Sequence, residues 1–220
     1  MSETLTSVFR VAAFTIVALV PLINPAGTAP IFLSLTNGES DRVRARMAIG
    51  IARNAAVLLA AAILGGSLVL RLFGLSLAEI RIAGGLLVIA TAWHLMRTDQ
   101  RPDAAITAIS RRDAHEPTHA TFYPLTFPVT IGPGSLAIAV TLGAGAGDAA
   151  RMATLLGALA GTVIVAVTIY LCYRFAARAA RLLGDAGTLV LFRLSAFILL
   201  AVGVKILSDG IVERFTTGSA

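Results

Sequence analysis

The sequence predicts an all-α integral membrane protein in which six transmembrane helices form a 3+3 inverted repeat. The chain of 220 residues is 57% apolar and only 14% charged, with a mean hydropathy of +0.85. Soluble chains carry about 25% charged residues, so this chain has too few to cover a water-facing surface. In addition, two long apolar blocks are interrupted by proline and glycine at corresponding places in the two halves.

Six windows are apolar enough to cross a hydrocarbon core about 30 Å thick, which takes about 20 helical residues. The N-terminal window is interpreted as a span and not as a cleavable signal peptide. Glu3 precedes the first arginine, and the apolar run continues without a small-residue cleavage site. The six predicted spans are residues 8–35, 47–70, 77–96, 122–142, 152–175 and 189–207.

The basic residues favour one orientation of these spans. The first, third and fifth connections between spans, together with the adjoining span ends, hold twelve of the 18 Lys and Arg residues. Because basic residues gather on the cytoplasmic side, both termini are predicted to be periplasmic. The cytoplasmic set is Arg42, Arg44, Arg46, Arg53, Arg97, Arg101, Arg111, Arg112, Arg174, Arg178, Arg181 and Arg193, and the other set is Arg10, Arg71, Arg81, Arg151, Lys205 and Arg214.

Several function classes are disfavoured. The net charge of +6 lies between apolar blocks, so it indicates topology and no nucleic-acid partner is expected. A single cysteine, Cys172, excludes a disulfide scaffold and a Cys-ligated zinc site. Phosphate-binding, nucleophile-elbow and zinc-helix motifs are absent from the sequence. We therefore expect no enzymatic activity, no catalytic residues and no cofactor.

Residues 97–119 are predicted to be a cytoplasmic linker between a first three-helix repeat, residues 1–96, and a second, residues 120–220. Pro117 would interrupt the helix needed to bring the linker's histidines onto one face, so no metal site is expected there. The four linker side chains of metal-ligand type are Asp113, His115, Glu116 and His119.

The repeat is visible in the interruptions of the two longest charge-free windows, which are 28 and 31 residues long. Two alignments of the interruptions are open: one sets Pro21 on Pro128, and the other, shifted by one residue, sets Pro25 on Pro133. Each half consists of a broken span and two further spans, so the second half enters the membrane from the opposite side. The interruptions are Pro21-Leu22-Ile23-Asn24-Pro25-Ala26-Gly27-Thr28 and Pro128-Val129-Thr130-Ile131-Gly132-Pro133-Gly134-Ser135.

Three motifs resemble the MarC family of bacterial inner-membrane proteins, which includes SnatA-type transporters of small neutral amino acids. The resemblance covers nearly the whole chain and implies a multi-pass protein of the inner (plasma) membrane. For the transporter branch it implies movement of glycine, alanine, serine or threonine, with export as the expected direction. The motifs are Asn24-Pro25-Ala26-Gly27 followed by Pro30-Ile31-Phe32-Leu33, Gly132-Pro133-Gly134, and Arg81-Ile82-Ala83-Gly84-Gly85.

The interruptions are predicted to bind the substrate. Asn24 before Pro25 is a helix-start signal, and Gly132 before Pro133 repeats it with glycine as the cap. Unpaired amides at the two helix starts would bind a carboxylate, and carbonyls at the opposing ends would bind an ammonium group. Small neighbours would leave room for a side chain of a few atoms. The predicted binding residues are Asn24, Pro25, Ala26, Gly27, Thr28, Gly132, Pro133, Gly134 and Ser135.

Arg53 and the adjacent Asn54 are further candidates for substrate binding. Arg53 lies about 10 Å along the helix from Arg46, so it either binds substrate or gates its entrance, or it snorkels to the headgroups. Gly157 and Gly161 form a small-residue face that is interpreted as a packing seam.

Other interpretations are kept open. The pair Gly84-Gly85 is also interpreted as a packing seam, and Arg81 with Glu79 as an interfacial anchor or ion pair. The interruptions could serve packing alone, as in a membrane scaffold or regulatory subunit without transport activity, or the protein could be a passive channel. Association with the lipid bilayer is expected, and a homo-oligomer is left open.

Overall fold

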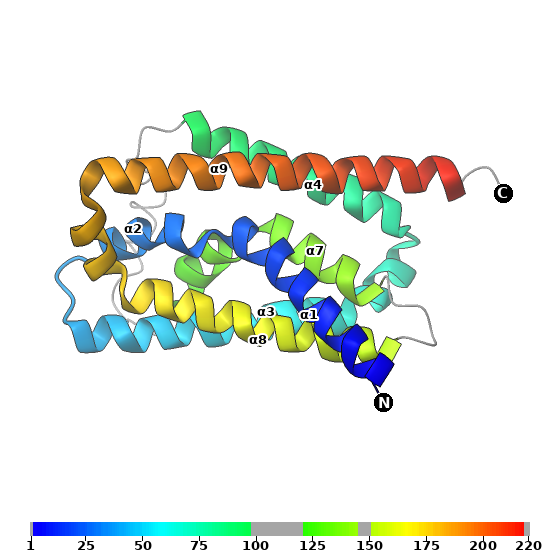
Figure 1. The fold of residues 1–220 in the computed structure, drawn as a ribbon, viewed down its shortest axis with the longest axis horizontal. Coiled ribbons are helices and arrows are strands. Elements are labelled where there is room, and N and C mark those ends of the chain that lie inside the picture. The colour runs from blue at the N-terminus through cyan, green and yellow to red at the C-terminus, as the bar shows by residue number, and fades with distance from the viewer. Residues whose placement is uncertain (1, 98–120, 145–150, 218–220) are drawn as a thin grey trace.

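The computed structural model describes residues 2–97, 121–144 and 151–217, and every element within these ranges is helical. The helices run mostly along the long axis of the molecule, and both chain ends lie at one end of that axis (Figure 1). The elements are α1 (Ser2–Ile23), α2 (Pro25–Leu35), α3 (Asp41–Phe73), α4 (Leu77–Arg97), η1 (Thr121–Thr130), α7 (Pro133–Ala144), α8 (Arg151–Arg174) and α9 (Ala176–Thr217).

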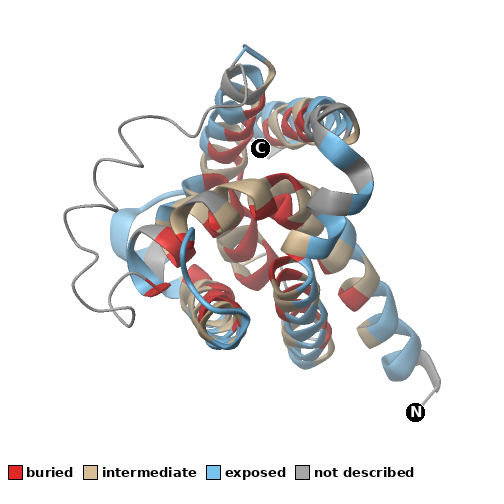
Figure 2. Ribbon diagram, turned by 90° about the vertical axis from the view of Figure 1, so that its left-hand side faces the viewer, coloured by how far each residue is buried: buried red, intermediate tan, exposed pale blue. Residues whose placement is uncertain are grey.

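The helices form three layers. The pair α3 and α8 lies on one side and the pair α4 and α9 on the other (Figures 1 and 2). The interrupted stretches α1–α2 and η1–α7 lie between the two pairs, where they contact helices from both. Both predicted interruptions are therefore in the middle layer of the molecule.

The outer surface is apolar. On α3, Ile51 and Leu59 are fully buried, whereas Val57 and Leu68 on the opposite face are 62% and 68% exposed. A helix that is apolar on all sides is typical of a membrane-spanning segment. Exposed apolar side chains on most of the other helices extend this surface around the bundle, as a lipid environment requires.

Glycines allow the helices to approach closely at the predicted seams. A Cβ atom added at Gly157 would lie 2.6 Å from the Val8 carbonyl oxygen, and one at Gly161 would lie 2.7 Å from Thr15 Cβ. One added at Gly85 would lie 2.6 Å from the backbone nitrogen of Leu207. The prediction that these glycines serve packing is confirmed.

Three stretches are long and apolar enough to span a membrane: Thr4–Leu33, Asp41–Leu68 and Arg151–Arg174. The η1–α7 pair adds a fourth if it counts as one span with a 76° bend. These results hold for the described residues, and the full set of six spans stays a prediction.

Two further predictions concern the rest of the chain. The helix at the sixth predicted span, α9, is longer than the predicted window 189–207 and bends at Gly184, whose φ is +61°. Beyond Arg97, which ends α4, the predicted linker lies outside the described residues, and so do its four potential metal ligands.

Candidate functional site

The first interruption consists of one residue. Asn24 has the left-handed conformation, with φ 48° and ψ 55°, which asparagine tolerates better than most residues. Its N–H donates to the Val20 carbonyl at 2.9 Å, and its own carbonyl accepts the Thr28 N–H at 3.0 Å. Helical hydrogen bonding thus continues across the interruption, and α1 and α2 lie within a single candidate span.

Asn24 also caps α2, as the sequence predicts. Its side-chain oxygen accepts the Gly27 N–H at 3.1 Å. A Cβ atom at Gly27 would overlap the Asn24 side chain, so glycine is needed there to accommodate the cap. The expectation that the amides of Gly27 and Thr28 are unpaired is wrong, because both donate to Asn24.

The second interruption is longer and less regular. Within η1 the backbone is non-helical at Tyr123 and Phe127. The Thr130 hydroxyl donates to the Leu125 carbonyl, five residues earlier, at 2.6 Å. The element η1 is a π-helix, and π-helical turns are rare and frequently occur at functional sites. The two interruptions therefore differ in size, although the sequence predicts equivalent ones.

The helix after the second interruption starts where the sequence predicts. Pro133 is the first residue of α7, as Pro25 is of α2, so the structure favours the alignment of Pro25 with Pro133. The Gly132 carbonyl accepts the Ser135 hydroxyl at 2.9 Å and the Leu136 N–H at 3.3 Å. Gly132 thus corresponds to Asn24 but has no capping side chain.

The space beside Gly134 is occupied. A Cβ atom added there would lie 2.8 Å from Val88 Cγ2 on α4 and 3.7 Å from Leu22 Cδ1 on α1. The expectation that small residues leave open room at the interruptions is wrong for Gly27 and Gly134, because neighbouring side chains lie against both glycines.

Tyr173 on α8 brings the two interruptions together. Its hydroxyl lies 2.9 Å from Thr28 Oγ1 on α2 and 2.8 Å from Thr130 Oγ1 on η1. Its ring stacks on Phe32 of α2, with a centroid separation of 4.8 Å and an interplanar angle of 6°. One buried hydroxyl thus connects the two interrupted stretches, which come from opposite halves of the chain.

Sequence reasoning missed Tyr173. It precedes Arg174 at the end of the fifth predicted span, where a tyrosine is typical of a membrane interface. The same window also contains Tyr170, so the sequence did not distinguish Tyr173 or indicate a partner for it.

Arg53 lies on the surface of the bundle. It is on the exposed face of α3, whereas Ile51, Ala52 and Ala55 on the same helix are buried. Asn54 is half-buried. This placement favours the interpretation that Arg53 snorkels to the headgroups.

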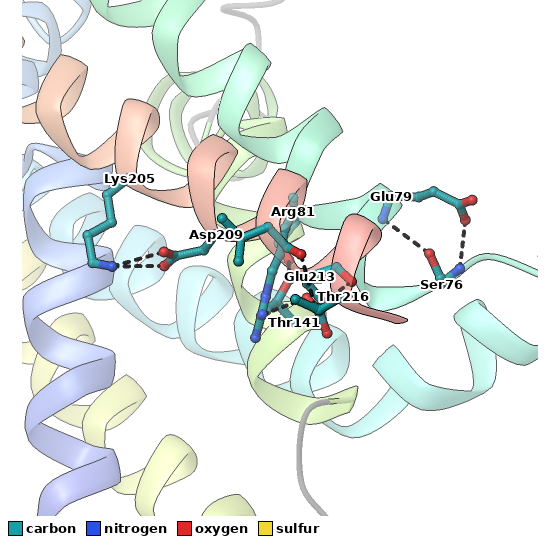
Figure 3. Close-up of polar contacts among 10 residues, drawn as sticks. Ser76, Glu79, Arg81, Thr141, Lys205, Asp209, Glu213 and Thr216 are labelled. Atoms are coloured by element: carbon teal, nitrogen blue, oxygen red, sulfur yellow. Dashed lines mark hydrogen bonds and ion pairs between the residues drawn. The ribbon is translucent and has the colours of Figure 1, made fainter. Parts of the chain in front are cut away.

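Charged side chains gather at the end of the bundle that holds the chain termini (Figure 3). Arg81 on α4 pairs with Glu213 on α9 at 2.7 Å, and Glu79 pairs with Arg214 at 3.7 Å. Arg81 and Glu79 both form ion pairs at the opening of α4, as predicted, but each pairs with a residue of α9 and not with the other. Lys205 and Asp209 form a further, exposed pair along α9 at 2.9 Å.

The fold and the apolar surface define an all-helical integral membrane protein. A model of the family described as "MarC family integral membrane protein" matches residues 9–215, so the chain belongs to this family. The chain is 29% identical over 215 residues to an inner membrane protein named MarC from Salmonella typhimurium, covering 95% of this chain and 97% of that protein. A protein of the same name from Escherichia coli matches at the same identity and coverage. No solved structure matches.

Proposed function

We propose that the protein is a secondary transporter of small neutral amino acids, such as threonine, alanine, serine or glycine, across the bacterial inner membrane. The proposed direction is outward. The observation that carries the proposal is the shared contact of Thr28 and Thr130 with the Tyr173 hydroxyl. Secondary transporters commonly bind substrate where interrupted helices of two repeats meet, and this contact joins the interrupted stretches of the two proposed repeats.

The packing of the halves supports the proposal. The interrupted stretch α1–α2 packs on α8 of the second half, and α7 packs on α3 of the first half. The third helix of each half, α4 and α9, pair with each other. Such exchanged pairings are expected of two inverted repeats that pack around a common site.

The chemistry of the buried polar groups favours a cargo without net charge. Among the described residues, the buried polar side chains are hydroxyls and one amide, none of which carries a charge. A cargo with net charge would be costly to place among them, since no opposite charge is buried nearby. A zwitterionic amino acid has no net charge, and its two polar groups can hydrogen-bond to hydroxyls and carbonyls.

The close packing favours a small cargo. The glycines at the two helix starts, Gly27 and Gly134, already lie against Asn24 and Val88. A ligand there must displace side chains to enter, and the volume to be cleared increases with its size. Cargo with a side chain of only a few atoms requires the least rearrangement.

The proposed orientation places both termini in the periplasm. It rests on the distribution of arginines. The two termini lie at the same end of the bundle, which agrees with an even number of passes (Figure 1).

Counterflow in proteoliposomes tests the transport function. Vesicles loaded with unlabelled amino acid should take up labelled threonine, alanine, serine or glycine with saturable kinetics. Thr130→Val should reduce this uptake. Thr162→Val is the matched control, because Thr162 is equally buried and donates only to the Ala158 carbonyl of its own helix.

Three results would contradict the proposal. Uptake equal to that of empty vesicles, under proton and sodium gradients alike, would leave the scaffold or regulatory subunit as the remaining interpretation. Non-saturating uptake without counterflow would indicate a channel. An equal reduction of uptake by Thr130→Val and Thr162→Val would show that transport does not depend on the contact between the interruptions.

A further inference from the structure

We propose that Tyr173 is the positioning residue that holds the two interruptions together as one site. Its hydroxyl contacts both interrupted stretches, and its ring stacks on Phe32. The kinetic part of this inference rests on the proposed transport function, whereas the structural part does not.

The hydroxyl protons define a direction for the contacts. Each hydroxyl donates one hydrogen bond. Thr130 donates to the Leu125 carbonyl at 2.6 Å, so Tyr173 donates to Thr130. The contact with Thr28 is then a hydrogen bond only if Thr28 donates to Tyr173, and the Asn24 carbonyl oxygen, 3.1 Å from Thr28 Oγ1, competes for the same proton. When Thr28 donates to Tyr173, the chain runs from Thr28 through Tyr173 and Thr130 to the carbonyl of Leu125. When Thr28 donates to Asn24, the chain begins at Tyr173.

Tyr173 lies on a regular helix, whereas Thr28 and Thr130 lie at or beside irregular backbone. The helix that carries it, α8, is continuous from Arg151 to Arg174 and packs closely on α1 through Gly157 and Gly161. The stacked Phe32, which is fully buried, restricts the tilt of the tyrosine ring. The Tyr173 hydroxyl oxygen therefore holds both interrupted stretches in place relative to α8.

Because both threonines contact the same Tyr173 hydroxyl, we expect the three residues to act as one unit. If both threonine hydroxyls are removed, the Tyr173 hydroxyl remains buried without the two partners it has in the wild type. An orphaned buried polar group costs more than a lost hydrogen bond, whereas apolar replacement of all partners is nearly neutral. The effects of the three residues on stability are therefore expected to be coupled.

Thermal unfolding of the purified protein in detergent tests this coupling without any transport assay. Tyr173→Phe should lower the Tm of the wild type. In the Thr28→Val/Thr130→Val background, the same Tyr173→Phe change should raise the Tm, because it removes the orphaned hydroxyl. A Tyr173→Phe change that lowers the Tm, or leaves it unchanged, in the double-valine background would overturn the proposal.

Transport kinetics test the positioning role. Tyr173→Phe keeps the ring on Phe32 but removes both hydroxyl contacts, so KM should rise about tenfold, equivalent to about 1.4 kcal/mol, while Vmax stays within about twofold. Phe32→Leu removes the stacking but keeps the hydroxyl, and it should raise KM less. An unchanged KM in Tyr173→Phe would overturn the positioning role.

The two readouts separate the two proposals. If the wild type transports no amino acid but the reversal of the Tm effect is observed, the transport function fails and the structural link stands. If transport is observed without the reversal, the role of Tyr173 fails. Should Tyr173→Phe not fold, the pair Thr28→Val and Thr130→Val tests the link, because their combined Tm loss should exceed the sum of the single losses.

Discussion

The side-chain oxygen of Asn24 accepts a hydrogen bond from the backbone N–H of Gly27, at 3.1 Å. This contact lets one residue end α1 and begin α2. The side chain supplies the cap, and the left-handed backbone supplies the change of direction. The two contributions can be separated by mutation.

Asn24→Ala should destabilise the protein more than Asn24→Gly. Both lose the cap, but alanine must also adopt the left-handed conformation, which costs about 1–2 kcal/mol and which glycine adopts freely. Thermal or chemical unfolding of the two variants measures the difference. Equal losses of stability would show that the backbone conformation at Asn24 does not limit stability.

Gly66→Ala should destabilise the protein by about 1–3 kcal/mol, the usual cost of overpacking. A Cβ atom there would lie 2.5 Å from the Val140 carbonyl oxygen on α7. The adjacent Gly65 has no atom within 4 Å of the corresponding position and is the matched control. Gly65→Ala should be neutral or stabilise by up to about 1 kcal/mol, as expected of alanine within a helix. The same loss in both variants would argue against a close α3–α7 contact.

Glu213→Gln should weaken the pairing of α4 with α9 and lower stability by about 1 kcal/mol, the upper range for a partly exposed ion pair. Its partner Arg81 lies 2.7 Å away, and both side chains are 30% exposed. The reversed pair Arg81→Glu/Glu213→Arg should recover part of the loss in unfolding measurements. Lys205→Gln is the control, because the Lys205–Asp209 pair is more exposed and lies within one helix. A reversed pair less stable than both Arg81→Glu alone and Glu213→Arg alone would contradict a direct Arg81–Glu213 interaction.

Membrane-impermeant maleimide should label both chain ends from the periplasm. In a Cys172→Ser background, cysteine at Thr4, which begins the first candidate span, or at Phe215, near the end of α9, should react in intact spheroplasts. Cysteine at Glu39, in the turn between α2 and α3 at the opposite end of the bundle, should react only after lysis. The reverse pattern would invert the proposed orientation.

The sequence by itself determined the family and where most helices lie. The third and fifth predicted spans agree with α4 and α8 to within one residue at each end, because span length follows from the thickness of the apolar layer. Proline sets the starts of α2 and α7, since its fixed φ suits the first helical position. The predicted end of the sixth span was less accurate, because hydropathy indicates where a helix enters the membrane and not where the helix stops.

Only the tertiary structure decided how the interruptions are occupied and what joins them. The Gly27 amide, expected to be free, is paired because the Asn24 side chain folds back onto its own helix, and Val88 from another helix lies against Gly134. Thr28 and Tyr173 are 145 positions apart in the chain, so their contact depends on the packing of α2 against α8. Apolar periodicity indicates which face of a helix is buried, but it carries no information about which distant hydroxyl that face meets.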